Sequence, residues 1–137
     1  MIGIYNGVVD NVDNIKVSPM SRAYTFGDAV YGVIPYANGF IHYGQHISRF
    51  MKSLKNLNIQ LDQKIVEEDI AKLPVKDTGY VYYQVSKGID KVRSHVWEGG
   101  EPERFGFFAE HDLQPGEPKT LMILEDNRWT RCDIKAT

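Results

Sequence analysis

Two Asn-Gly pairs, each lying between extended stretches, constrain the fold of this chain more than any other feature. Asn-Gly tolerates the positive φ angles of a two-residue type I′ turn, so such a pair is the strongest local signal for a β-hairpin. The first pair is Asn6-Gly7 and the second is Asn38-Gly39. We therefore predict two hairpins, formed by residues 2–5 with 8–9 and by residues 29–37 with 40–42.

Pro35 lies inside the longest of these stretches. Proline has no backbone N–H to donate, so a sheet accepts it at an edge strand or at a bulge. Residues 29–37 are therefore expected at one of those two places. Arg22 and Asp28 flank the turn that precedes the stretch. We interpret them as structural partners that shape this turn.

The hydrophobic period changes from two to that of a helix near Gly44. One apolar stripe of an amphipathic helix follows, made of Ile47, Phe50, Met51, Leu54 and Leu57. Asp62 is a suitable N-cap for a second, shorter helix that runs through Lys72 and ends before Pro74. The sequence therefore predicts two helices after the second hairpin.

Two further strands are expected at residues 79–86 and 104–110, the first of them rich in Tyr and Val. A long loop joins them, and loops of that length in a compact domain are usually functional or mobile. Pro115, Gly116 and Pro118 mark the best domain boundary. We predict an α+β domain at 1–114, a linker at 115–119 and the start of a second domain at 120–137, opening with a strand at 120–124.

The composition excludes several classes of protein. A net charge of −2 and a pI near 6.1 give no electrostatic basis for binding nucleic acid or an anionic membrane. No apolar run approaches the roughly 20 residues that a membrane helix needs, and the N-terminus has no signal-peptide pattern. Cys132 is the only cysteine, which favours a reducing compartment. We expect a soluble, cytoplasmic protein.

Metal binding is not expected. His42 and His46 have the spacing of a helical metal pair, but Gly44 lies between them and no third ligand supports them. Cys132 follows Arg131, yet a lone cysteine is more often a small buried hydrophobe than a reactive thiol.

Four stretches carry a more specific signal when taken together. They are SRAYTFGDAVYG at 21–32, HISRF at 46–50, RSH at 93–95 and NRWTRCDIK at 127–135. In this order and at these distances they resemble the fold-type IV pyridoxal-phosphate enzymes, which include D-amino-acid aminotransferases, branched-chain aminotransferases and aminodeoxychorismate lyases. The resemblance runs from Ile4 to Ala136. It implies the small N-terminal domain of that fold, an antiparallel-rich sheet with two helices, plus the first strand of an incomplete second domain.

The resemblance assigns roles to individual residues. Lys135 matches the catalytic lysine that binds pyridoxal 5′-phosphate through a Schiff base, and Arg49 matches the arginine that holds the cofactor phosphate. An amine can condense with the cofactor aldehyde and later carry a proton, whereas a guanidinium offers several fixed donors to a phosphate. Arg128 matches an arginine near the cofactor. Tyr31 matches a wall residue that helps to hold the substrate carboxylate.

Arg93 and His95 match the R-x-H pair of the D-selective members, which traps the substrate α-carboxylate in the neighbouring subunit. Gly32 departs from the pattern, because D-selective relatives usually have an acid there. The stretch Pro35-Tyr36-Ala37 also differs. Both departures bear on substrate specificity more than on cofactor binding.

Each of these residues also has an ordinary structural interpretation. On its local sequence alone, Lys135 would be interpreted as a solvated lysine, and Arg49 as an exposed helix arginine paired with an acid. Arg93 and His95 are then plain loop residues. Tyr31 is a core residue, alone or in addition to its role in the wall.

The resemblance implies a homodimeric aminotransferase that exchanges an amino group between a D-amino acid and a 2-oxo acid. Full-length relatives are about twice as long as this chain. We therefore expect residues 1–137 alone to be inactive, since half of the cofactor site would be missing. A branched-chain aminotransferase, an aminodeoxychorismate lyase and a non-catalytic dimerisation fragment stay open as alternatives.

Overall fold

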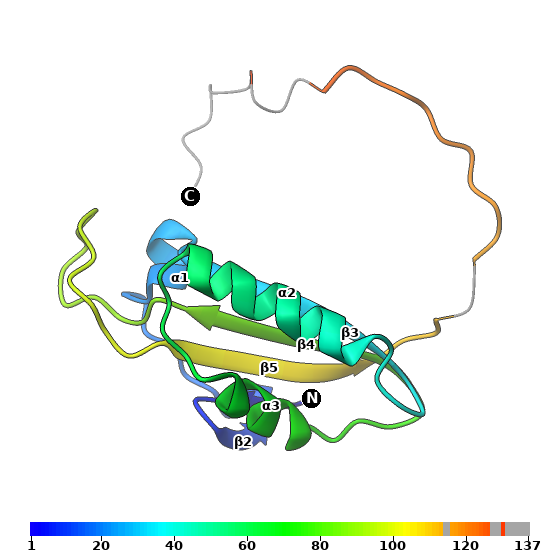
Figure 1. The fold of residues 1–137 in the computed structure, drawn as a ribbon, viewed down its shortest axis with the longest axis horizontal. Helices are drawn as coiled ribbons and strands as arrows, with labels where there is room; N and C mark the ends of the chain where they lie inside the picture. Colours follow the sequence, from blue (N-terminus) through cyan, green and yellow to red (C-terminus); the bar gives the residue numbers. More distant parts are fainter. Residues whose placement is uncertain (114–115, 127–129, 131–137) are drawn as a thin grey trace.

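The fold is a five-stranded antiparallel sheet with two main helices on one of its faces (Figure 1). The computed structural model describes residues 1–113, 116–126 and 130. The strand order in the sheet is β2-β1-β5-β4-β3. The strands are β1 (Ile2–Tyr5), β2 (Val8–Asn11), β3 (Ala29–Ala37), β4 (Thr78–Ser86) and β5 (Glu103–Glu110). The helices are α1 (Arg22–Phe26), α2 (Tyr43–Asn56) and α3 (Gln63–Ala71), with the short 3-10 turn η1 at Val12–Asn14.

The first predicted hairpin is confirmed. Asn6 and Gly7 take φ angles of 48° and 86°, and Tyr5 pairs with Val8 across the turn. The Asn6 side chain also accepts a hydrogen bond from the backbone N–H of Arg104 at 2.8 Å. The turn therefore fastens the β1–β2 hairpin to the start of β5.

The second predicted hairpin is only partly formed. Phe40 makes a single isolated bridge to Tyr36, and residues 40–42, which the structure describes, do not continue it as a strand. His42 has a left-handed φ of 51°, and α2 begins at the next residue. The chain thus leaves the sheet for the helix before a second strand has room to pair.

Pro35 lies in an edge strand, as predicted, because β3 is the last strand in the sheet order. The Pro35 carbonyl accepts from the N–H of Ile41 at 2.9 Å, on the side away from β4. The nitrogen and the carbonyl of one strand residue point to the same side. The missing N–H of Pro35 therefore costs no bond to β4.

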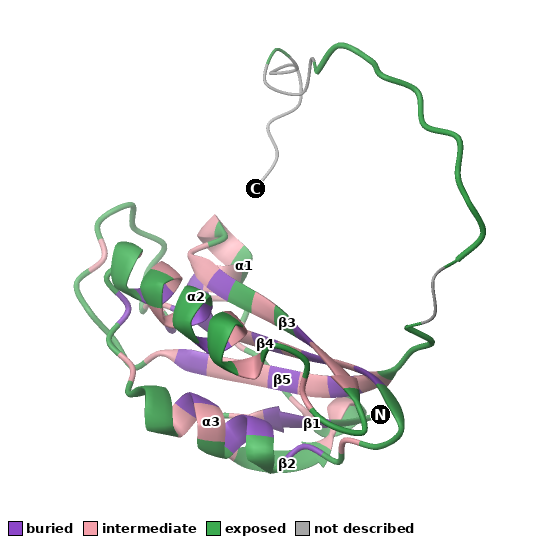
Figure 2. Cartoon of the chain, turned by 45° about the vertical axis from the view of Figure 1, so that its right-hand side comes forward, coloured by how far each residue is buried: buried purple, intermediate pink, exposed green. Residues whose placement is uncertain are grey.

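Both main helices pack on the same face of the sheet, which we call the covered face (Figures 1 and 2). Alternate residues of the strands point to it, as the strand period of two requires. Asp62 caps α3, as predicted, by accepting from the N–H of Lys64. The core between the helices and the sheet consists of Ile4, Val30, Ile34, Ile47, Phe50, Leu54, Ile59, Val66, Ile70, Leu73, Val81, Tyr83, Val85 and Phe108.

The opposite surface of the sheet, which we call the open face, carries no helix of the size of α2 or α3 in the described part of the chain. Its side chains come from the other half of the strand alternation and include Tyr5, Tyr31, Val33, Tyr82, Gln84, Glu103, Phe105 and Phe107. Rings stack across it: Tyr31 on Tyr82 at 5.6 Å between centroids, and Tyr82 on Phe107 at 5.3 Å. The open face is therefore an aromatic surface.

The strand expected at 120–124 is not formed in the described part of the chain, where residues 116–126 have neither helix nor strand. Leu121, Met122, Ile123 and Leu124 are all largely exposed. A strand needs hydrogen-bonding neighbours, and the described residues provide none for this segment. The proposed division of the chain at residues 115–119 stays a prediction. None of the described helices has the length and apolar character needed to cross a bilayer.

Candidate functional site

Arg22 fastens the first turn of α1 to the long loop between β4 and β5. Ser21 caps α1, and Gly27 ends it in a left-handed conformation with φ 66°. The buried Arg22 guanidinium pairs with Asp28 at 2.7 Å and with Asp90 at 2.5 Å. It also donates to the carbonyl of Ser94 at 2.9 Å. The prediction that Arg22 and Asp28 are structural partners is confirmed, and the contact with the loop was not foreseen.

The Arg93 and His95 side chains meet at the ring of Phe26. The Arg93 guanidinium carbon lies 4.3 Å from the centroid of this ring, and the His95 ring meets it edge-on at 5.3 Å. Arg22 also lies 4.3 Å from the same centroid. The R-x-H pair is therefore held against α1, although its residues are more than 60 positions away from Phe26 along the chain.

Tyr31 lies on the open face and is 66% exposed, so it is not a core residue. Its ring stacks on Tyr82, whose hydroxyl donates to the Gln84 side chain at 2.7 Å. Gly32 points the other way, towards α2, where an added Cβ would come within 3.3 Å of the Phe50 ring. The glycine that departs from the family pattern therefore leaves room for a core phenylalanine.

Arg49 lies on the exposed surface of α2. Its guanidinium is 3.4 Å from Nδ1 of His46, one helical turn earlier, and no carboxylate pairs with it among the described residues. Burial lowers the pKa of His46, and the nearby charges of Arg49 and His42 lower it further. Gln45, His46 and Arg49 together line a shallow depression. The positive charge of this depression is that of Arg49, whose guanidinium suits an anion.

The three groups of predicted site residues lie in different places. Arg49 is on α2 over the covered face, Tyr31 is on the open face, and the Arg93–His95 pair is on the loop beside α1. No hydrogen bond, ion pair or ring contact joins these groups within the described part of the chain. Lys135 and Arg128 lie outside the described residues, as does Cys132.

Two features of this surface were missed in the sequence. Phe26 was recognised only as part of a motif, and Tyr82 only as part of a strand. The strand alternation offered a signal for Tyr82, since it shares a face with Tyr31 once β3 and β4 pair. Nothing local predicts the contacts of Phe26. Among the described residues, no group of three or more His, Cys, Asp or Glu side chains is placed to hold a metal ion.

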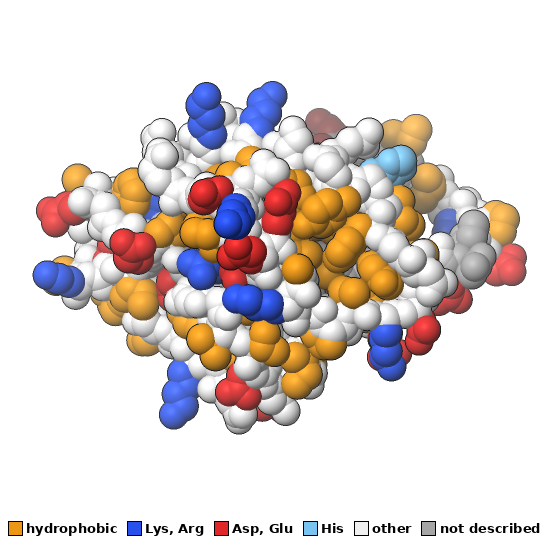
Figure 3. Space-filling model, turned by 60° about the horizontal axis from the view of Figure 1, so that its bottom comes forward, with side chains coloured by type: hydrophobic (Ala, Val, Ile, Leu, Met, Phe, Trp, Pro, Cys, Tyr) orange, Lys and Arg blue, Asp and Glu red, His pale blue; other side chains and the backbone are white. Residues whose placement is uncertain are grey.

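On the surface that carries α3 and β2, the side-chain charges are not all of one sign. Figure 3 brings this side forward, and Lys and Arg side chains alternate there with Asp and Glu beside a hydrophobic patch. Binding to nucleic acid relies on a basic patch or stripe. This view of the molecule therefore gives no support to a nucleic-acid interface.

Comparison with curated proteins finds D-alanine aminotransferases. The protein of Listeria monocytogenes is 32% identical over 145 residues, which cover 97% of this chain and 50% of that protein. The protein of Staphylococcus aureus is 30% identical and covers 96% of this chain, again at 50% of its own length. The chain spans about half the length of the curated relatives it matches. No protein-family model matches it.

Comparison with solved structures finds the same fold at lower identity. The branched-chain amino acid aminotransferase of Escherichia coli has a TM-score of 0.69 and 18% identity, covering 80% of this chain and 40% of its own. The 4-amino-4-deoxychorismate lyase of Pseudomonas aeruginosa has a TM-score of 0.68 and 18% identity, covering 82% and 41%. These structures establish the architecture of the described domain.

Proposed function

Because this chain is a relative of the fold-type IV aminotransferases by sequence and by fold, we propose that it forms the N-terminal part of a pyridoxal-phosphate enzyme. The proposed reaction transfers an amino group between a D-amino acid and a 2-oxo acid. One observation carries the choice of substrate class: Arg93 and His95 are held together on the Phe26 ring. Two cationic or polar donors at one place suit a carboxylate.

Arg49 fits the phosphate group of the cofactor. Its guanidinium is exposed and has no acidic partner among the described residues, so its donors are available. Lys135 is assigned to the covalent bond with the cofactor and to proton transfer at the substrate Cα; it lies outside the described residues. When bound, pyridoxal phosphate supplies the electron sink for the reaction.

Arg93 is well placed to bind a carboxylate while it rests on Phe26. A cation–π contact uses the flat face of the guanidinium, and the N–H groups around its edge stay free to donate. Arg93 is exposed, and so is His95. We assign the substrate carboxylate to these two residues together with Tyr31. Because the exposed Tyr31 ring rests on Tyr82, its hydroxyl is turned to solvent rather than to the core.

The remaining parts of the proposal concern the whole protein. We propose that it is a cytoplasmic homodimer, with Arg93 and His95 serving the site of the neighbouring subunit. We further propose that residues 1–137 alone are inactive, because the described domain offers only Arg49 to the cofactor phosphate. The second candidate function is that of a branched-chain aminotransferase or aminodeoxychorismate lyase, since structures of both kinds share the fold.

The test is a kinetic comparison in the full-length protein that contains this chain. Arg93→Leu is expected to raise KM for D-alanine about 10-fold or more, because a lost hydrogen bond to a charged group costs about 1.5–3 kcal/mol. Effects on kcat are expected to be smaller. Lys91→Leu, an exposed substitution in the same loop, is the matched control and should leave KM unchanged.

The amino donor separates the two candidate functions. D-alanine should be used with 2-oxoglutarate far better than L-leucine. A preference for L-leucine, with KM for it unaffected by Arg93→Leu, would refute the D-amino-acid assignment and favour the branched-chain alternative.

A further inference from the structure

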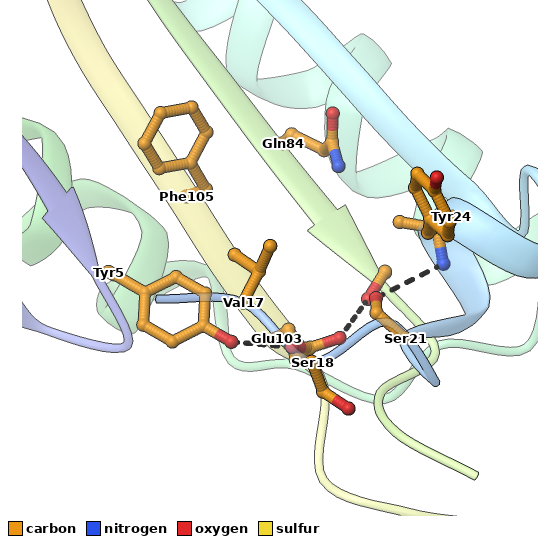
Figure 4. Close-up of a pocket in the computed structure, with 10 residues that line it drawn as sticks. Tyr5, Val17, Ser18, Ser21, Tyr24, Gln84, Glu103 and Phe105 are labelled. Carbon is orange, nitrogen blue, oxygen red and sulfur yellow. Dashed lines mark hydrogen bonds between the residues drawn. The ribbon is translucent and has the colours of Figure 1, made fainter. Parts of the chain in front are cut away.

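A pocket lies at the end of the open face, where β5, β4 and the segment leading into α1 come together (Figure 4). Its volume is about 270 Å³. None of the described residues assigned above to cofactor or substrate lines it. The lining residues are Tyr5, Val17, Ser18, Ser21, Ala23, Tyr24, Gln84, Ser86, Glu103 and Phe105.

Glu103 supplies the only carboxylate among the described residues that line the pocket. The residue is 8% exposed. One carboxylate oxygen accepts from the Tyr5 hydroxyl at 2.5 Å and the other accepts from the Ser86 hydroxyl at 3.2 Å. Figure 4 shows the Tyr5 hydroxyl, from β1, directed at the Glu103 carboxylate. Both donors are neutral, so they orient the negative charge without cancelling it.

This charge is not balanced by a cation in the described part of the chain. Among those residues, no Lys, Arg or His forms an ion pair with Glu103. The adjacent Arg104 points to the covered face and pairs with Asp69 at 2.8 Å. A buried carboxylate is expensive unless a cation accompanies it. Within the described part of the chain, the Glu103 carboxylate is therefore able to accept a positively charged group.

The remaining walls of the pocket are largely apolar. Val17 and Ala23 contribute aliphatic surface, and Tyr24 and Phe105 contribute rings. A cavity of about 270 Å³ is slightly below the roughly 300–1,000 Å³ typical of sites for drug-sized ligands. A ligand that matches this pocket would be small, with one charged end and an apolar body.

We propose that this pocket binds a small organic ammonium ion, with the charged nitrogen on the Glu103 carboxylate and the apolar body against Tyr24 and Phe105. This site is separate from the proposed cofactor and substrate site, and the proposal does not depend on the aminotransferase function. Aromatic walls suit such a ligand because ring faces attract cations.

The Tyr5 hydroxyl holds the Glu103 carboxylate in place across the physiological pH range. Burial, followed by the hydrogen bond to Glu103 and the charge of that carboxylate, raises the pKa of the Tyr5 hydroxyl to about 12. The hydroxyl therefore remains a donor at neutral pH. Because the hydroxyl occupies only one lone pair of a carboxylate oxygen, other lone pairs of the Glu103 carboxylate can accept hydrogen bonds from an ammonium group.

The test is a calorimetric titration of the full-length protein with N,N-dimethylbenzylamine. This tertiary amine is protonated at neutral pH and cannot condense with an aldehyde, so it does not report on a cofactor. Saturable binding is expected, weakened at least 10-fold by Glu103→Gln. Glu101→Gln removes an exposed acid from the preceding loop and should leave the affinity unchanged. Benzyl alcohol, which has no charge, should not bind.

A second variant guards against a folding defect in Glu103→Gln. Tyr24 is 74% exposed, so Tyr24→Ala should leave thermal unfolding unchanged while it weakens binding of the amine several-fold. Absence of saturable binding, equal binding of benzyl alcohol, or unchanged affinity in either Glu103→Gln or Tyr24→Ala would overturn the proposal.

Discussion

Two buried acids lie on opposite faces of the sheet, and each accepts a hydrogen bond from a tyrosine. On the covered face, Asp69 accepts from the Tyr83 hydroxyl at 2.7 Å. On the open face, Glu103 accepts from the Tyr5 hydroxyl at 2.5 Å. Asp69 is 2% exposed and Glu103 is 8% exposed. The local chemistry of the two acid–tyrosine pairs is the same.

The two pairs differ in their counter-charge. Asp69 also accepts from Nε of Arg104 at 2.8 Å, and Lys72 approaches it at 4.0 Å. Glu103 has only hydroxyl donors among the described residues. Because Glu103 and Arg104 are neighbours in β5, the strand alternation sends the acid to one face and the base to the other. The Asp69 carboxylate and its cation stabilise the fold, whereas the Glu103 carboxylate, which has no cation among the described residues, is the one we propose to bind a ligand.

The largest effect is expected from removing the cation on the covered face. Arg104→Met leaves Asp69 buried without its main partner, which typically costs about 3–5 kcal/mol. Urea unfolding should show this as a lower free energy of unfolding. Lys64→Met, at an exposed position on α3, is the control and should stay within about 0.5 kcal/mol. A loss below about 1 kcal/mol for Arg104→Met would mean that Asp69 does not need its cation.

A smaller effect is expected from neutralising each acid in turn. Asp69→Asn breaks a charged pair and should cost about 2 kcal/mol, in the range of hydrogen bonds to charged groups. Glu103→Gln removes a charge that has no cation among the described residues, so its cost should be below about 1 kcal/mol. The measurement is the same urea titration. Equal losses for the two variants would contradict the distinction between the faces.

The smallest effect is expected at alkaline pH. The pKa of Tyr5 is raised to about 12, mainly by burial and then by Glu103. A raised pKa means that the stability is fully present below the ordinary value near 10 and is lost as the pH rises towards 12. Solvent reaches this ring and screens the interaction, which keeps the loss small.

Tyr5→Phe should therefore flatten the decline in stability between pH 10 and 12. Urea midpoints measured at intervals across this range provide the test. If the decline in stability is unchanged in Tyr5→Phe, it arises from the titration of other groups. Tyr83 is the obvious one, because burial and its bond to Asp69 raise its pKa as well.

Local signals predicted most of the elements. The Asn6-Gly7 turn, the cap at Asp62 and the edge position of Pro35 each follow from the chemistry of one or two residues, and each is confirmed. The fold class is also confirmed, since solved structures with TM-scores of 0.68 and 0.69 share the architecture of the described domain.

The failures arose where distant residues decide the outcome. Asn38-Gly39 is a hairpin signal, but the helix that starts at Tyr43 takes the chain away from the sheet. Residues 120–124 have strand composition and no neighbour to pair with in the described part of the chain. A strand is a property of two segments, and the sequence of one of them does not determine it.

The candidate site was predicted unevenly for the same reason. Arg22 and Asp28 are six residues apart, and their pairing was anticipated. Tyr5 and Glu103 are 98 residues apart, and no local pattern announces their contact. The roles of Lys135 and Arg128 stay predictions, because both lie outside the described residues.

Pro35 and the turn after it have a consequence for the behaviour of the protein in concentrated solution. The free edge of a sheet is a template on which another chain can add a strand, and repeated addition builds fibrils. At β3 the proline offers no donor, the Pro35 carbonyl already accepts from the N–H of Ile41, and the N–H of Ala37 already donates to the carbonyl of Gly39. This end of the edge is therefore protected against fibrillar growth by the chain itself.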